Sequence, residues 1–151
     1  MSFSIDPAGP VSRAVRLLAC LGLCAAYIQG GLVKWTDFDG ALAEMAHFGL
    51  APPAVFAVAV IVLELVASAM VLTGILRWAG ALALGGFTLL ATLLALRFWE
   101  MPQGQERLMT ANAFFEHIGL AGGFVLVAWL DLAGAARGRG TGAGPLREPA
   151  R

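Results

Sequence analysis

The apolar residues of this chain are gathered into four long blocks. Each block approaches the ~20 residues that an α-helix needs to cross ~30 Å of hydrocarbon. We expect spans over residues 11–33, 53–76, 78–98 and 113–132. With 59% hydrophobic and only 13% charged residues, a soluble chain of 151 residues would need a larger core than it can enclose. The sequence therefore predicts an all-α membrane protein, a four-transmembrane-helix bundle over residues 11–133.

The first block could instead be a cleaved signal peptide. Leu17-Leu18-Ala19-Cys20 resembles a lipoprotein cleavage site, but no apolar region fits between Arg16 and Cys20. Cys24-Ala25-Ala26 is a better cleavage site, yet the apolar stretch continues past it to Val33. We expect an uncleaved span in which the two cysteines are buried packing residues, since their spacing fits neither a redox motif nor a metal site.

A different pattern follows the first span. Residues 36–49 have helical periodicity but are too few and too polar to cross a bilayer. Thr36 followed by Asp39 resembles a capping box, and Gly49 provides a stop. We predict a short amphipathic helix in the outer interface, with Trp35 as an aromatic anchor.

Three further segments are polar or irregular. Residues 1–10 form a polar lead, and residues 99–112 a polar loop. Residues 134–151 are rich in Gly, Ala, Pro and Arg without periodicity, which predicts a disordered tail.

Basic residues divide unequally between the two ends of the spans, and this sets the orientation. One side collects Arg13, Arg16, Arg77, Arg137, Arg139, Arg147 and Arg151, whereas the other has Lys34, Arg97 and Arg107. By the positive-inside rule both termini lie in the cytoplasm, as four spans require. Ten basic residues balance ten acidic ones, so nothing suggests a nucleic-acid partner.

Glu64 is the only charged residue between His47 and Arg77. It lies about 12 residues, or roughly 18 Å, from the start of its span at Pro52. A charged group at that depth costs at least ~2.5 kcal/mol, so it should face protein or a cavity.

Other polar groups enter the spans from their outer ends. Counting along each helix predicts that these groups form one outer layer and that Glu64 lies about 8–10 Å deeper, near Thr88. Tyr27 would lie between the outer layer and Glu64. The layer itself would contain Gln29, Thr92, Arg97, Glu116 and His117, with Lys34 at its mouth.

Two interpretations of these polar groups stay open. In a structural network, Arg97 pairs with Glu116, and Glu64 is a neutral acid that donates a hydrogen bond across the bundle. In a functional site, the layer is the floor of a periplasm-facing pocket, and Glu64 accepts a proton or a quinol hydroxyl. Metal and haem sites are not expected, because the chain has only two histidines, His47 and His117.

Small residues should let the helices approach closely, because lipid provides no hydrophobic drive between them. Whether such contacts are internal or dimeric stays open. The candidates are Gly22, Ala26 and Gly30, then Ala79, Ala83 and Gly86, then Gly119 and Gly123.

Several short stretches, across roughly residues 13 to 132, resemble the DoxX family of small bacterial membrane proteins. They are Gly31-Leu32-Val33-Lys34-Trp35-Thr36-Asp37-Phe38, Phe48-Gly49-Leu50-Ala51-Pro52-Pro53-Ala54, Leu63-Glu64-Leu65, Leu72-Thr73-Gly74, Arg77, Arg97-Phe98-Trp99 and Phe114-Phe115-Glu116-His117-Ile118-Gly119-Leu120-Ala121-Gly122-Gly123. The resemblance implies a four-span bundle in the bacterial inner membrane. It also implies a link to quinone chemistry, through a subunit associated with a terminal quinol oxidase and thiosulfate:quinone oxidoreductase.

We therefore predict an accessory subunit linked to quinone-dependent redox chemistry rather than a stand-alone enzyme. Glu64 would be the central polar residue of this subunit. The cofactor that such a role admits is quinone. The partners of the protein would be membrane lipid and either a redox protein or a second copy of the chain. The alternative is a non-enzymatic scaffold, assembly factor or small-solute or lipid-handling protein, in which the polar residues merely set the helix register.

Overall fold

The computed structural model describes residues 9–141, and within that range the chain is helical and contains no strand. Four of the helices are long and apolar enough to cross a membrane, which confirms the predicted all-α, four-span architecture. The elements are α1 (Pro10–Thr36), α2 (Phe38–His47), α3 (Pro53–Thr73), α4 (Arg77–Ala95), the 3-10 helix η1 (Phe98–Glu100) and α5 (Gln105–Thr141).

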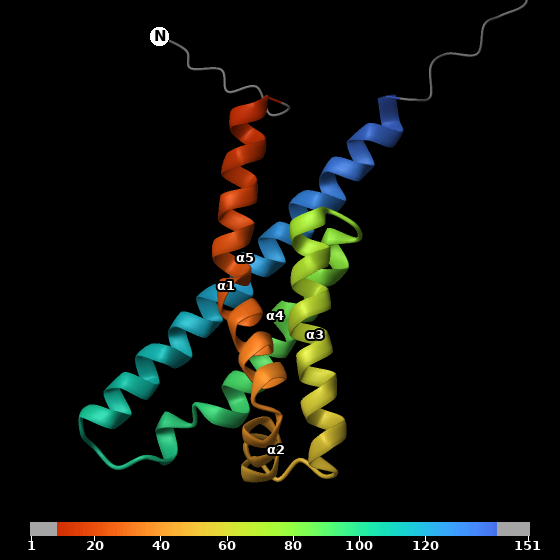
Figure 1. Cartoon of the computed structure of the whole chain (residues 1–151). Helices are drawn as coiled ribbons and strands as arrows, with labels where there is room; N and C mark the ends of the chain where they lie inside the picture. The colour runs from red at the N-terminus through yellow and green to blue at the C-terminus, as the bar shows by residue number, and fades with distance from the viewer. Residues whose placement is uncertain (1–8, 142–151) are drawn as a thin grey trace, which may run out of the picture.

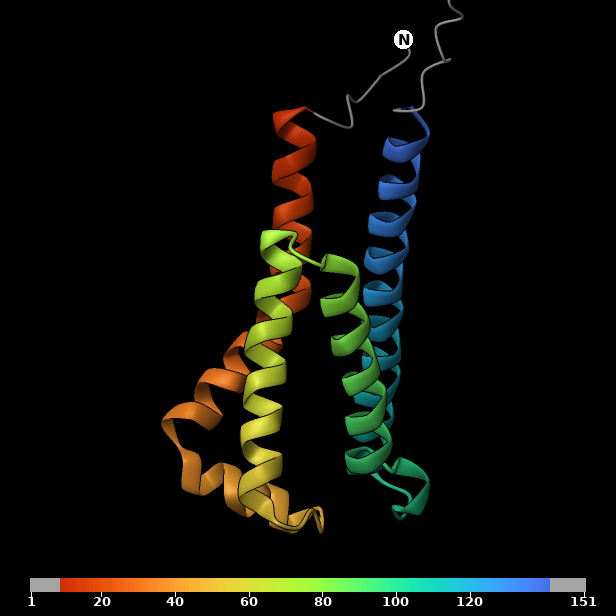
Figure 2. The same ribbon diagram turned by 90° about the vertical axis from the view of Figure 1, so that its right-hand side faces the viewer.

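The spans pack as a succession of neighbours. Helix α1 packs on α3, α3 on α4 and α4 on α5, whereas α1 and α5 barely touch. In Figure 1 the α4–α5 pair crosses α1 and α3 obliquely. Figure 2 shows that the start of α1 and the end of α5 lie at the same end of the molecule. An even number of crossings produces this arrangement.

The core lies where the spans meet and combines small side chains with the two aromatic residues Tyr27 and Phe124. It contains Cys20, Cys24, Tyr27, Ala67, Val71, Ala81, Leu84, Phe124 and Ala128. The predicted burial of both cysteines is confirmed. Many leucine and valine side chains point outward instead, with Leu18 67% and Leu90 72% exposed. Such an apolar exterior suits lipid, because hydrocarbon solvates these side chains as well as a protein core does.

Close helix contacts occur at glycines, but not at all of those predicted. A Cβ at Gly80 would lie 2.7 Å from the Ala67 carbonyl oxygen, and one at Gly123 would lie 3.1 Å from Leu23 Cδ2. Gly22, Gly86 and Gly119 make no close contact within the chain, since nothing lies within 4 Å of a Cβ built on them, and a dimeric contact at these glycines stays a prediction. Spacing along a helix shows which residues share a face, but the oblique crossing decides which part of that face meets a neighbour.

Helix α2 starts differently from the predicted capping box. The Asp37 side chain caps it, accepting a 3.0 Å hydrogen bond from the Gly40 amide. The Thr36 hydroxyl instead donates 3.0 Å back to the Leu32 carbonyl in α1. At the other end Gly49 adopts φ +71°, and its amide donates to the Ala46 carbonyl at 2.9 Å, which confirms the predicted stop.

The helix ends differ from the predicted span ends mainly in α5. It begins at Gln105 and runs to Thr141, so part of the predicted loop and part of the predicted tail are helical. Residues 105–118 contain neither proline nor glycine, and Glu106 stands favourably in the first turn beside the helix dipole. Polar residues indicate where a helix leaves the lipid, but the helix itself can continue beyond that point, as α5 does at both ends. The remainder of the predicted tail, and most of the predicted lead, lie outside the described residues.

Candidate functional site

Glu64 is buried in the middle of α3 and is paired with a lysine. Its Oε1 lies 3.7 Å from Lys34 Nζ, and the residue is 5% exposed. The same Lys34 Nζ lies 3.8 Å from Glu44 Oε2 on α2. One ammonium group therefore stands between two carboxylates, one buried and one reaching solvent.

The path of the chain explains why Lys34 meets Glu64. Helix α1 continues to Thr36 beside α3, and α2 then runs across the end of the bundle before the chain turns back into α3 (Figure 2). The last turn of α1 therefore faces the middle of α3, so the predicted depth difference between Lys34 and Glu64 is wrong. Gly30 makes room for the acid, since a Cβ there would lie 3.4 Å from both carboxylate oxygens.

A cavity of about 250 Å³ surrounds this ion pair and receives residues from all five α-helices. Its polar lining residues are Tyr27, Lys34, Glu44, Glu64, Thr88 and His117. The Tyr27 hydroxyl is hydrogen-bonded to Thr88 Oγ1, which also donates to the Leu84 carbonyl at 2.6 Å. Glu64 Oε2, by contrast, is buried and has no hydrogen-bond partner among the described residues.

An apolar cavity of about 270 Å³ adjoins the polar one. The two share the lining residues Lys34, Glu44, Phe87 and Ala91. The apolar cavity is further lined by Met45, Phe48, Leu50, Phe56, Val60, Leu90, Leu94 and Ala95. The site is thus amphipathic, with an ion pair at one end and aliphatic and aromatic walls at the other.

Three of the six predicted site residues meet at this cavity. Glu64, Lys34 and His117 line it, whereas Arg97, Glu116 and Gln29 do not. Gln29 and Glu116 are exposed. Thr92 is buried, and its hydroxyl donates to the Thr88 carbonyl of its own helix at 2.6 Å.

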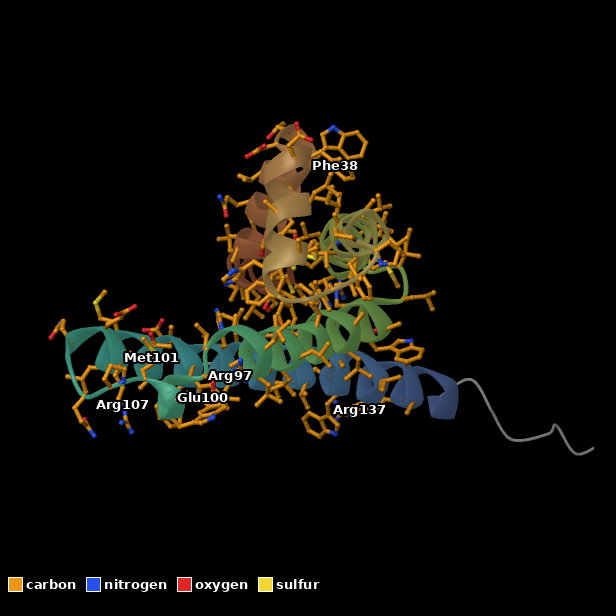
Figure 3. All side chains as sticks on the ribbon, turned by 90° about the horizontal axis from the view of Figure 1, so that it is seen from below. Phe38, Arg97, Glu100, Met101, Arg107 and Arg137 are labelled. Atoms are coloured by element: carbon orange, nitrogen blue, oxygen red, sulfur yellow. The ribbon has the colours of Figure 1, made fainter. Side chains whose placement is uncertain are left out.

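Arg97 pairs with Glu100 at 3.1 Å and not with Glu116. Figure 3 places both residues where α4 passes through η1 into α5, away from Phe38 at the start of α2. The predicted outer layer fails because α4 and α5 cross the other helices obliquely. Distance from a helix end therefore does not measure depth along a common axis.

The sequence interpretation missed the role of Glu44, which looked like a surface residue of an interfacial helix. Lys34 and Glu44 lie on different helices, so no i,i+4 spacing links them. Glu44 directly precedes Met45, an apolar residue of the helical pattern of α2 that is buried against α3. That neighbour was the one available hint that Glu44 lies near the bundle.

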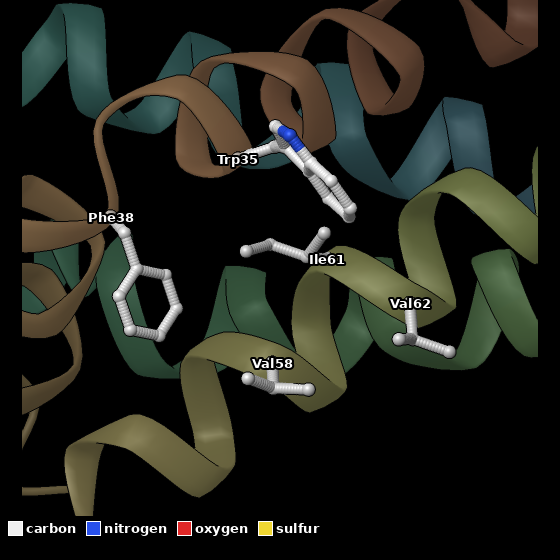
Figure 4. A pocket seen from close by; sticks show the side chains of 5 residues that line it. All are labelled: Trp35, Phe38, Val58, Ile61 and Val62. Atoms are coloured by element: carbon white, nitrogen blue, oxygen red, sulfur yellow. The ribbon is translucent and has the colours of Figure 1, made fainter.

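A second apolar groove, of about 340 Å³, lies where the α1–α2 elbow meets α3. Figure 4 shows its lining residues Trp35, Phe38, Val58, Ile61 and Val62, none of which is titratable. This groove can accommodate a hydrocarbon chain but offers no acid, base or nucleophile. Within residues 9–141, no three His, Cys, Asp or Glu side chains gather closely enough to hold a metal ion.

Four apolar helices around a buried ion pair define a multi-pass integral membrane protein. The sequence model of the DoxX family matches residues 15–97, more than half of the chain, and the chain belongs to the DoxX family. Lys34, Glu44 and Glu64 fall inside the matched region, and α5 with His117 follows it. No significant match is found among curated proteins or among solved structures.

Proposed function

We propose that this protein is an accessory subunit of the bacterial inner membrane that binds quinone for a redox partner. One observation carries the proposal: the buried, unpartnered Glu64 Oε2 lies beside Lys34 in a polar cavity that opens into an apolar one. A buried oxygen without a partner is costly, so it favours a ligand that donates a hydrogen bond.

The donors and acceptors of the cavity fit both forms of a quinone. The Lys34 ammonium can donate to a quinone carbonyl, and the Glu64 carboxylate can accept from a quinol hydroxyl. The walls formed by Phe48, Phe56 and Leu90 suit a ring edge and an isoprenoid tail. Ligand pockets usually measure ~300–1,000 Å³, a range that the two adjoining cavities reach only in combination.

A bound quinol supplies two protons and two electrons. In this proposal Glu64 Oε2 accepts one of the protons, and the second proton leaves to water past Glu44. Lys34 keeps the Glu64 carboxylate oriented toward the cavity. Glu44, whose side chain is 45% exposed and which also faces Lys34, links the cavity to water. The two electrons pass to the redox centre of a partner protein, which serves as the oxidant.

The proposed orientation has both termini in the cytoplasm. It rests on the excess of arginines at the end of the bundle that carries the α3–α4 turn, opposed by few basic residues at the other end. In this orientation the α2 end of the cavity opens toward the periplasm.

Quinone content tests the proposal. The full chain is purified in mild detergent, and the lipid extract is analysed for quinone by mass spectrometry. We expect about one quinone per chain in the wild type, and its loss in Glu64→Ala. Arg97→Gln, which lies outside the cavity, should retain it. Absence of quinone from a wild type that remains folded contradicts the proposal.

A non-enzymatic scaffold or lipid-handling protein is the second candidate, and one observation favours it. The Lys34–Glu64 pair neutralises the buried acid within the protein and joins α1 to α3. In that case Glu64→Gln should reduce stability without changing the bound lipids or quinones.

A further inference from the structure

The end of the bundle opposite Lys34 and Glu64 has a second polar cavity, which does not depend on the proposed function. It measures about 190 Å³ and lies between the first turns of α1 and the α3–α4 turn. Its lining includes Arg13, Arg16 and Arg77, with Leu17, Leu72 and Thr73 between them. Three guanidinium groups thus converge from two directions on one space.

Arg77 is held rigidly in this cavity. Its Nε donates to the Val71 carbonyl at 2.9 Å, and its NH1 lies 3.5 Å from Asp131 Oδ1. The other Asp131 oxygen accepts from the Trp78 amide at 3.3 Å. The one carboxylate nearby is therefore already engaged with Arg77 and the start of α4.

Arg13 and Arg16 have no such partner. Both are exposed, and no carboxylate among the described residues forms an ion pair with either of them. Arg16 also lines a neighbouring cavity of about 110 Å³ with Arg77 and Asp131. Among the residues that the structure describes, this region thus carries more positive charge than Asp131 can balance.

Apolar side chains surround these arginines. Val15 is 61% and Leu18 67% exposed on α1, and Ile75 in the α3–α4 turn is 69% exposed. A soluble anion would gain nothing from these surfaces. An anion that carries hydrocarbon chains would place its charge in the cavity and its chains along the helices.

We propose that this cavity binds the phosphodiester headgroup of an anionic phospholipid, such as phosphatidylglycerol or cardiolipin. Arg13 and Arg16 contact the phosphate oxygens, and Arg77 forms the fixed wall of the site. Basic pockets between membrane helices are suited to such headgroups, because guanidinium groups match phosphate geometry and each basic residue near the surface adds to the attraction for anionic lipid.

Native mass spectrometry of the full chain in neutral detergent tests this proposal. Phosphatidylglycerol and phosphatidylethanolamine are added separately to the wild type and to the Arg13→Gln/Arg16→Gln variant. We expect the wild type to prefer phosphatidylglycerol and the variant to bind it roughly tenfold or more weakly, as two such contacts predict. The matched control Arg97→Gln/Arg107→Gln removes two charges at the opposite end and should bind as the wild type does.

Competition separates the two sources of a phosphate. Excess inorganic phosphate should leave lipid binding unchanged, and displacement of the lipid would show that the cavity takes a free anion. Equal binding of both lipids, or unchanged binding in Arg13→Gln/Arg16→Gln, would also overturn the proposal. Because Arg13 and Arg16 make no ion pair with any residue in the range 9–141, thermal unfolding of this variant should match that of the wild type.

Discussion

Lys34 at the end of α1 forms an ion pair with Glu64 in the middle of α3, with 3.7 Å between Nζ and Oε1. Both side chains are largely buried, at 16% and 7% exposed. Glu64, the charged residue whose burial in the second span costs most free energy, is therefore paired with a cation from the first span, Lys34. The pair joins two helices and at the same time gives a polar end to an otherwise apolar chamber.

Breaking this pair should destabilise the protein. Lys34→Met leaves the Glu64 carboxylate buried without a counter-charge, and we expect the free energy of unfolding to fall by ~3 kcal/mol. Glu64→Gln should cost less, because Lys34 keeps Glu44 at 3.8 Å. The double variant Lys34→Met/Glu64→Gln should recover much of the loss. Denaturation in detergent, followed by tryptophan fluorescence, measures all four proteins.

The exposed pair of Arg97 and Glu100 is the matched control for this cycle. Its side chains are 54% and 52% exposed, so neutralising either should change stability by less than ~1 kcal/mol. Additive effects of the Lys34 and Glu64 substitutions would mean that the two residues do not interact.

Helix packing gives a second prediction. Gly80→Ala would bring a Cβ to 2.7 Å from the Ala67 carbonyl oxygen and 2.8 Å from Met70 Cβ. Backbone must move to accommodate it, and we expect a loss of ~1–3 kcal/mol in the free energy of unfolding. Gly119→Ala meets nothing within 4 Å and should be neutral or slightly stabilising. The reverse order in a thermal-unfolding assay would contradict the packing described above.

The structural features that the sequence predicts correctly are local ones, whereas those that depend on how the helices cross could not be predicted. Apolar length identified the four spans, and the left-handed Gly49 marked the end of α2, because both depend on neighbouring residues. The isolation of Glu64 in an apolar run likewise indicated that it must face protein. These features need no knowledge of tertiary structure.

The partners of the polar residues could not be obtained in this way. Whether Gly119 or Gly80 contacts a neighbour depends on the angle at which α4 and α5 cross the other helices. Arg97 pairs locally instead, with Glu100 three residues further along the chain. Lys34 provides the clearest case. It looked like a residue at the membrane surface, and only the packing of α1 on α3 places it opposite Glu64.

Topology provides a third prediction. In a Cys20→Ala/Cys24→Ala background, single cysteines at Ile75 in the α3–α4 turn and at Gln103 before α5 should label from opposite sides. A membrane-impermeant maleimide added to intact cells should reach Gln103→Cys but not Ile75→Cys. Disrupting the cells should make the second position reactive. Labelling of Ile75→Cys in intact cells would reverse the proposed orientation.

Photolabelling with a reactive short-chain quinone tests the central claim most directly, because peptide mapping shows where the ring binds in native membranes. We expect adducts in the wild type on the segments that line the two joined cavities, namely residues 26–34, 44–64, 87–95 and 117–120. Excess unlabelled quinone should suppress them, Glu64→Ala should lose them, and Arg97→Gln should keep them. Adducts spread over the lipid-facing surface, insensitive to competitor and equal in Glu64→Ala, would contradict a quinone site at the Lys34–Glu64 pair.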